Sequence, residues 1–174
     1  MDYRRDFTPG GVYFFTVVTY QRAPLLIDHI DRLRHAFAVE QGRNPFGIDG
    51  IVILPDHLHT IWRLPDGDED YAGRWSRIKR LFSSGLPRMT KAASLVAKRE
   101  RGVWQRRYWE HRIRDAQDWE RHMDYIHYNP VKHGYATMPA RWPYGSFERC
   151  VRRGWYEADW GAAEPEAVRG MDPE

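Results

Sequence analysis

Two histidines, His57 and His59, have the spacing that lets two side chains bind one metal ion. They follow the apolar run 51–54 and a turn at Pro55, in a segment whose β-branched, aromatic and aliphatic residues predict a strand. Successive side chains of a strand point to opposite faces, so the two imidazoles share one face, about 7 Å apart. Two neutral imidazoles can bind a divalent cation when a third group closes over them. Such pairs also occur on ordinary surfaces, so the third group decides the matter.

A second group of chemically useful residues lies on a predicted helix over 115–129. Asp115 is the expected N-cap, because its side-chain oxygen can accept from backbone N–H groups of the first turn. Tyr125 and Asn129 are four residues apart, which places them on one helix face with Cβ atoms about 6 Å apart. His122 falls near the same face. The helix could therefore present a tyrosine hydroxyl and an amide oxygen to a metal ion held by the strand histidines.

This combination resembles a known superfamily. A strand-borne His-hydrophobe-His pair, followed by a helix with one tyrosine and an amide residue four positions later, is similar to the HUH single-strand endonucleases that use one catalytic tyrosine. The runs Tyr-Ile-His-Tyr-Asn-Pro-Val-Lys-His-Gly (125–134) and Trp-Gln-Arg-Arg-Tyr-Trp-Glu-His (104–111) look like one branch, the REP-associated tyrosine transposases. The resemblance covers roughly residues 10–150. Asn129 departs from the insertion-sequence transposases of the superfamily, which typically have glutamine there.

The resemblance implies a reaction and a site for it. The family chemistry is transesterification on single-stranded DNA, in which the Tyr125 hydroxyl attacks phosphorus and leaves a 5′-phosphotyrosine and a free 3′-hydroxyl. His57, His59 and Asn129 would hold a Mg²⁺ or Mn²⁺ ion that polarises the scissile phosphate. The expected partner is a repetitive extragenic palindrome, read as a DNA hairpin with a short flanking single strand. The resemblance leaves open whether the protein is a monomer or a homodimer.

The stretch from Arg74 to Arg114 is strongly basic, with thirteen Lys/Arg against Glu100 and Glu110. So large an excess favours phosphate contact over a merely solvated helix face. Aromatic residues alternate with arginines over 103–113, as expected where bases stack and phosphates are neutralised, although an edge strand packed on the core would look similar. The residues expected to contact DNA are Arg77, Lys79, Arg80, Arg106, Arg107 and Lys132.

Two other function classes stay open on the sequence alone. One is a non-catalytic hairpin-binding protein, against which the intact histidines and Tyr125 argue. The other is a metal-dependent nuclease that uses activated water, with Tyr125 structural; a covalent protein–DNA adduct would separate it from the transposase. Among the supporting residues, Asp56 is either a turn residue or an acceptor for a ligand histidine. His122 either orients Tyr125, accepts its proton, or lies on the surface.

The predicted elements assemble as an α+β fold, an antiparallel sheet of four to five strands with helices packed on it. The ferredoxin-like topology is what the resemblance adds. The strand over 12–20 is apolar on both faces and therefore expected to be central. The expected elements are a strand over 12–20, a helix over 28–42 with Asp28 as N-cap, a strand over 48–54, the histidine strand, helices over 74–84 and 88–101, a strand over 103–113 and the helix over 115–129.

Length and charge predict one domain over 1–156, which the resemblance implies to be an HUH transposase domain, and an acidic, flexible tail over 157–174. The whole chain of 174 residues carries a net charge of +3, while the tail has six acids against Arg169, so the domain is near +8. No stretch approaches the roughly 18 apolar residues of a membrane helix, and the N-terminus lacks an apolar signal segment. Cys150 is the only cysteine. We therefore expect a cytoplasmic, nucleoid-associated protein with no membrane partner.

Overall fold

The computed structural model describes residues 7–88 and 101–173. The expected helix over 88–101 falls on residues 89–100 and so lies almost wholly outside the described residues. Within the described ranges, no helix has the length and apolar character needed to cross a membrane. The elements in chain order are β1 (Val12–Val18), η1 (Tyr20–Arg22), α1 (Ile30–Arg43), β2 (Gly47–Ile53), β3 (His57–Arg63), α2 (Tyr71–Ser84), β4 (Trp109–Arg112), α4 (Ala116–Lys132), η2 (Pro139–Arg141), α5 (Phe147–Arg152) and η3 (Glu166–Val168).

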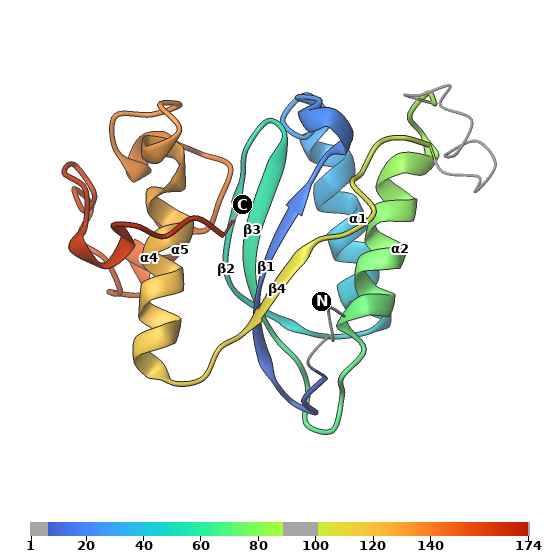
Figure 1. The fold of residues 1–174 in the computed structure, drawn as a ribbon, viewed down its shortest axis with the longest axis horizontal. Coiled ribbons are helices and arrows are strands. Elements are labelled where there is room, and N and C mark those ends of the chain that lie inside the picture. The colour runs from blue at the N-terminus through green and yellow to red at the C-terminus, as the bar shows by residue number, and fades with distance from the viewer. Residues whose placement is uncertain (1–6, 89–100, 174) are drawn as a thin grey trace.

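The strands form one antiparallel sheet in the order β2-β3-β1-β4, with β1 in a central position as expected. β1 pairs antiparallel with β3 on one side and with β4 on the other, while β2 and β3 form a hairpin. Two βαβ units, β1-α1-β2 and β3-α2-β4, therefore interleave in one sheet. The expected α+β fold with a ferredoxin-like sheet is confirmed (Figure 1).

Alternating side chains of the central strands separate two cores, one on each face of the sheet. On β3, Leu58 and Trp62 join the core under α1 and α2, whereas Ile61 joins the core under α4. The indoles of Trp62 and Trp75 stack with ring centroids 4.2 Å apart and tie α2 to the sheet. Figure 1 shows α1 and α2 on one side of the sheet and α4 with α5 on the other. His57 and His59, four and two residues before Ile61 respectively, therefore face α4.

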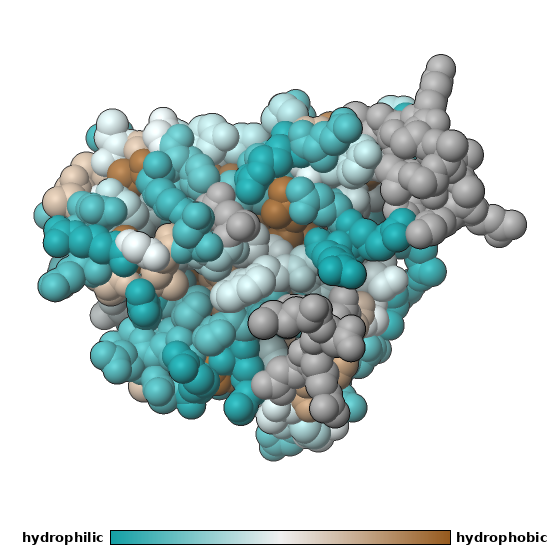
Figure 2. Space-filling view, in the orientation of Figure 1, coloured by the Kyte–Doolittle hydropathy of each residue, from teal (hydrophilic) through white to brown (hydrophobic). Residues whose placement is uncertain are grey.

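The expected strand over 103–113 forms only in part, because the chain bulges beside β1. Thr16 pairs with Trp109 in β4, and Thr19 bridges to Trp104. Between these two pairs lie two residues of β1 and four of the other segment, so two extra residues bulge out. The bulge contains Arg106 and Arg107, both of which are exposed. Figure 2 shows a largely hydrophilic surface on this face of the molecule, with apolar patches between the polar groups.

The start of one helix was predicted correctly and the start of another was not. Asp115 is the N-cap of α4, and its side chain accepts a hydrogen bond from the Asp118 backbone N–H. The prediction of Asp28 as an N-cap is wrong, because α1 begins at Ile30 and its N-cap position is His29, without a side-chain cap. The backbone N–H of His29 bonds to Leu25 O, so the chain already turns before the helix begins.

Residues 157–173 run beside α4. Within them η3 packs on α4, where Val168 is buried and the Arg121 guanidinium donates to Ala167 O. The last described residues then cross toward the sheet, as the path to the C-terminus in Figure 1 shows. The expected boundary between a domain over 1–156 and a flexible tail stays a prediction, although these contacts place the segment against the domain.

One buried histidine makes the fold sensitive to acid. His127 on α4 is 2% exposed, and its Nε2 lies 2.8 Å from Ser146 Oγ. Burial, helped by the nearby charge of Arg149, lowers the pKa of His127 from its usual 6.5 to about 3. The unfolded chain therefore binds a proton near pH 6.5 while the folded protein does not. The stability contributed by neutral His127 is complete above pH 6.5 and is lost as the pH falls toward 3.

We expect His127→Gln to remove this acid sensitivity while keeping a hydrogen bond to Ser146. Between pH 7 and pH 4, the free energy of unfolding should fall more steeply for the wild type, by up to about 1.4 kcal/mol per pH unit. Urea unfolding curves at a series of pH values measure the difference. His35→Gln, at an exposed histidine, is the control and should follow the wild type. Parallel curves for wild type and His127→Gln would contradict the assignment.

Candidate active site

β3 and β1 together position the two predicted histidines. His57 and His59 lie at the start of β3 with 1% and 0% exposure, and their ring centroids are 5.0 Å apart. Across the sheet they pair with Val18 and Thr16 of β1. The strand alternation predicted from the sequence is therefore present, and both imidazoles lie under α4. Leu58 between them anchors the strand in the opposite core.

Asp56 fixes the protonation of His57. The Nδ1 of His57 lies 2.6 Å from Asp56 Oδ1, and an ionised carboxylate only accepts, so Nδ1 carries the hydrogen and donates it. Burial raises the pKa of Asp56, but the hydrogen bond from His57 and the Arg22 guanidinium outweigh burial, so the net pKa is lowered and the carboxylate stays charged. The lone pair of neutral His57 is consequently on Nε2. Asp56 was expected to be either a turn residue or a hydrogen-bond acceptor for a histidine, and the role of acceptor for His57 is confirmed.

Thr16 fixes His59 in the same tautomer. The Thr16 hydroxyl donates its one hydrogen to Pro173 O at 2.7 Å, and its Oγ1 is 2.8 Å from His59 Nδ1. With its hydrogen already used, the hydroxyl must accept from His59, so Nδ1 again carries the hydrogen. Both histidines therefore present Nε2 lone pairs, the form in which imidazole binds a metal ion. Sequence reasoning missed Thr16, which only the strand register places beside His59.

One face of α4 carries three side chains over the histidines. The ring of Tyr125 lies 5.1 Å from that of His59, and the ring of His133, just after the helix, lies 5.0 Å from that of His57. Asn129 is midway between Tyr125 and His133 at four-residue steps, so it shares their face. Asn129 is 0% exposed, and neither atom of its side-chain amide has a hydrogen-bond partner within the described part of the chain. A buried amide in that condition suits a ligand held at the site.

Close packing brings α4 this near to the sheet. A β-carbon on Gly50 of β2 would lie 2.5 Å from Met123 Sδ and 3.6 Å from Ile126 Cδ1. Any larger residue at position 50 would therefore have to displace the Met123 side chain, so glycine permits this close packing. Two imidazole nitrogens and an amide oxygen suit a divalent metal ion, and these are the three ligands expected from the sequence.

Lys132 lies beside the predicted nucleophile. Its Nζ is 3.2 Å from the Tyr125 hydroxyl and 5.0 Å from the centroid of the Tyr125 ring. A cation at that distance stabilises the phenolate form of tyrosine. Lys132 also pairs with Asp172, at 3.6 Å, while Pro173 accepts from Thr16. The lysine expected at the DNA surface therefore contacts Tyr125, and the C-terminal segment touches both sides of the site.

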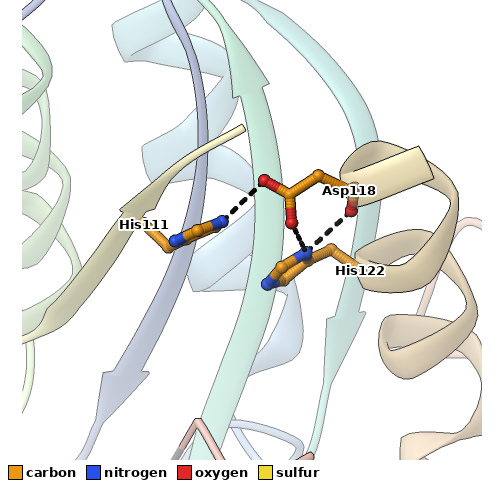
Figure 3. Close-up of side chains that lie close together, drawn as sticks. All are labelled: His111, Asp118 and His122. Carbon is orange, nitrogen blue, oxygen red and sulfur yellow. Dashed lines mark hydrogen bonds and ion pairs between the residues drawn. The ribbon is translucent and has the colours of Figure 1, made fainter. Parts of the chain in front are cut away.

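A second cluster, which the sequence reasoning missed, joins β4 to the start of α4 (Figure 3). His111 Nε2 is 2.8 Å from Asp118 Oδ2, and His122 Nδ1 lies 2.8 Å from the Asp118 carbonyl and 3.2 Å from its Oδ1. The ligand atoms of the three residues lie within 4.8 Å of one another. The Arg114 Nε, 3.1 Å from Asp118 Oδ2, supplies a fixed positive charge there. A metal ion would have to compete with that charge.

The charges in this cluster assign His122 a supporting role. Burial raises the pKa of Asp118, but hydrogen bonds from Arg114 and His111 outweigh it and hold the pKa well below its usual range. Burial lowers the pKa of His122, which keeps the imidazole neutral. The His122 ring stacks on His111 and packs 4.8 Å from Phe14. The expectation of a surface position is wrong, because the ring is buried between α4 and the sheet.

The residues expected to contact DNA do not all lie together. Arg77 is ion-paired with Glu40 and Asp70 on α1 and α2. Lys79 donates to Gln105 O, which places it beside the bulge that carries Arg106 and Arg107, and Arg80 is exposed on the same helix. These cations lie around α2 and the bulge, whereas Lys132 lies at Tyr125.

Comparisons with known proteins agree with this geometry. A REP-associated tyrosine transposase of Escherichia coli is 42% identical over 160 residues, covering 91% of this chain and 90% of that protein. A Haemophilus influenzae protein named for the same family is 44% identical over 172 residues, covering 97% and 98%. A solved structure of a REP-associated tyrosine transposase bound to a REP hairpin matches with a TM-score of 0.81 and 39% identity over 96% of each chain. No family model matches.

Asp56→Asn should weaken metal binding at the histidine pair. The change keeps an acceptor for His57 but removes the negative charge that makes the imidazole a better ligand, and such changes lower affinity by about 10- to 100-fold. Calorimetric titration of the protein with Mn²⁺ measures the effect. Asp31→Asn is the matched control, because the Asp31 side chain is 98% exposed. Equal Mn²⁺ affinities for the two variants would show that Asp56 does not support a metal ligand.

Proposed function

The chain belongs to the REP-associated tyrosine transposases, and we propose that it cleaves and rejoins single-stranded DNA beside a repetitive extragenic palindromic hairpin. The observation that supports this most directly is the position of Tyr125 over the buried histidine pair, with its ring 5.1 Å from that of His59. The related structure with a REP hairpin supports the choice of substrate. A protein that acts on DNA of this kind would be found in the cytoplasm, with the nucleoid.

Tyr125 is the proposed nucleophile. Its hydroxyl oxygen forms a bond to phosphorus while the bond from phosphorus to the 3′ oxygen of the preceding nucleotide breaks. The 5′ end then carries a phosphotyrosine, and the released strand ends in a 3′-hydroxyl after it takes up a proton. The number of phosphoester bonds does not change, so attack by another 3′-hydroxyl reverses the step without a nucleotide cofactor. Lys132 Nζ, 3.2 Å from the attacking oxygen, donates a hydrogen bond to it, and a cation at that place favours the phenolate form.

The histidine pair and Asn129 form the proposed metal site. When bound there, a Mg²⁺ or Mn²⁺ ion would offset charge on the non-bridging oxygens of the scissile phosphate. Asp56 and Thr16 hold both imidazoles in the tautomer whose lone pair is on Nε2, and Asn129 contributes a buried amide that lacks another partner among the described residues. The chain's own part in the reaction is thus to hold three ligands and one nucleophile in a fixed arrangement.

The basic surface supplies most of the affinity for DNA in this proposal. Lys79, Arg80, Arg106 and Arg107 surround α2 and the bulge, while the exposed part of Arg77 can add to them despite its ion pairs. Phosphate contacts of this kind bind any sequence, so they position the strand without selecting it. This proposal is preferred to a non-catalytic binder or a water-using nuclease because the ring of Tyr125 lies 5.1 Å from that of His59.

The C-terminal segment must leave the site before DNA can enter. Asp172 pairs with Lys132, and Pro173 accepts from Thr16, so the segment lies between the groups that would meet the phosphate. Truncation after Gly170 should therefore raise the initial rate of cleavage several-fold, since it keeps the buried Val168 in place. Asp159→Asn, on an acid outside these contacts, serves as the control. A truncated protein no faster than the wild type would mean that the segment does not limit access.

Changing Tyr125 tests the function itself. Tyr125→Phe removes one oxygen and keeps the ring, so hairpin binding should be normal while strand cleavage and the denaturant-resistant protein–DNA adduct disappear. Tyr128→Phe is the matched control, because Tyr128 is on another face of α4, and it should keep most of the activity. The measurement is trapping on end-labelled hairpin DNA, with the adduct mapped by peptide mass. An adduct on Tyr128, or cleavage by the wild type without any adduct, would overturn the proposal.

A further inference from the structure

His111, Asp118 and His122 form a cluster that is separate from the histidine pair of β3 (Figure 3). His111 comes from the edge strand β4, while Asp118 and His122 come from the first two turns of α4. The ring of Phe14 lies between the two groups, 4.8 Å from the ring of His122 and 5.6 Å from that of His59. The proposed reaction uses none of the three residues of the cluster.

The three side chains converge as metal ligands do. Each histidine turns one ring nitrogen toward the Asp118 carboxylate, as Figure 3 shows, at 2.8 Å for His111 Nε2 and 3.2 Å for His122 Nδ1. Metal–ligand bonds of about 2.0–2.2 Å place the ligand atoms of a tetrahedral zinc site about 3.3 Å apart. All three ligand atoms already lie within 4.8 Å of one another, so small rotations of the two rings would bring them around one ion.

The types of ligand indicate which metal the cluster would take. Two imidazole nitrogens and one carboxylate oxygen suit Zn²⁺ and similar divalent transition metals. A neutral imidazole has one ring hydrogen, so each ring would carry it on the nitrogen that faces away from the ion. The His111 side chain is 24% exposed, so a water molecule can reach the site and supply the fourth ligand.

Arg114 is the group that opposes an ion at this place. Its Nε lies 3.1 Å from Asp118 Oδ2, where its positive charge repels a cation. The Arg114 side chain is 68% exposed, so it can turn into solvent when an ion binds to the carboxylate. The arginine therefore lowers the affinity of the cluster for a metal without blocking it.

An ion in the cluster would hold two elements together. α4 packs on β2 and β3, and the stacked rings of His111 and His122 join its first turns to β4 as well. A metal ion that binds these ligands only in the folded protein stabilises the fold. Tyr125 follows His122 by three residues on the same helix, so the stabilised part of α4 leads directly to the proposed nucleophile.

We propose that His111, Asp118 and His122 form a second metal site, which binds Zn²⁺ or a similar divalent transition metal and joins the start of α4 to β4. The inference goes beyond the proposed reaction and does not depend on it, because it uses no residue of the histidine pair. The alternative is a network of hydrogen bonds in which the Arg114 guanidinium takes the place of an ion.

The first test is calorimetric titration of the protein with Zn²⁺. His111→Ala removes one ligand and should lower the affinity by more than about 100-fold, since loss of a group that merely supports a ligand already costs about 10- to 100-fold. Arg114→Gln removes the opposing charge and should raise the affinity about 5- to 10-fold. Arg112→Gln is the matched control, because it loses the same charge at an exposed position next to His111, on the other face of the strand, and it should bind as the wild type does.

The second test locates the ion in the wild type, where the histidine pair can also bind Zn²⁺. Imidazole NMR signals report each ring separately, so those of His111 and His122 should change as Zn²⁺ is added. Zn²⁺ in about 100-fold excess over its Kd should also raise the Tm by several degrees, and by less in His111→Ala.

Zn²⁺-dependent changes confined to the rings of His57 and His59 would overturn the inference. Equal Zn²⁺ affinities for the wild type, His111→Ala and Arg114→Gln would also overturn it and would leave the cluster as a hydrogen-bonded network. If His111→Ala loses its native circular-dichroism spectrum, the comparison of Arg114→Gln with Arg112→Gln and the NMR spectra of the wild type decide the matter.

Discussion

The distance between α4 and the sheet is the constraint on which the candidate site depends. Gly50 lets Met123 and Ile126 pack directly on β2, and this contact holds the helix low enough for Tyr125 to lie 5.1 Å from His59. The pleat of β3 places both histidines at the site, because His57 and His59 must share the face under the helix while Leu58 enters the opposite core. The packing of α4 on the sheet therefore holds the proposed nucleophile and the proposed metal ligands in register without any loop between them. Sites built on strands and helices in this way keep their geometry more strictly than sites on loops.

The polar groups in this interface are arranged for binding and not for stability. Asp56 and Thr16 satisfy the Nδ1 side of each histidine, and both imidazoles are buried with Nε2 as the acceptor side. Asn129 is buried with no partner for its amide among the described residues, an arrangement that a packed core would normally exclude. Proteins break such local rules mainly at functional sites, where a ligand satisfies the groups when it binds. Lys132 likewise prepares Tyr125 for function, since a buried phenol beside a cation ionises more readily than one in an apolar core.

Charged groups from two distant parts of the chain would act on the same DNA substrate in the proposed reaction. The cations around α2 and the bulge attract a phosphate backbone, while Asp172 of the C-terminal segment pairs with Lys132 at the nucleophile. In the proposed reaction, DNA and this acidic segment would compete for the same lysine. The pair is partly exposed, so its own contribution to stability is small, and a polyanion can displace it. The bulge beside β1 brings the basic surface close to β3, which carries the histidines. The residues proposed to position the DNA strand therefore lie near those proposed to cleave it.

Local patterns in the sequence determined the elements of this protein and the residues of its site. The period of two in β3 predicted that His57 and His59 share a face, the period of 3.6 in α4 placed Asn129 with Tyr125, and the cap at Asp115 located the helix start; the resemblance to the HUH endonucleases supplied the ferredoxin-like topology and the family. The catalytic roles of these residues stay predictions.

What local patterns could not provide were contacts between distant segments: Thr16 beside His59, Lys132 beside Tyr125, Asp118 between two histidines, Pro173 at the site, and the two-residue bulge that shortened the expected strand over 103–113. Such contacts depend on strand register and on how closely α4 packs, and both are set by the whole fold because they join residues that no short-range period relates. Tertiary packing alone therefore decided the tautomers of the histidines, the neighbour of the nucleophile and the cluster around Asp118.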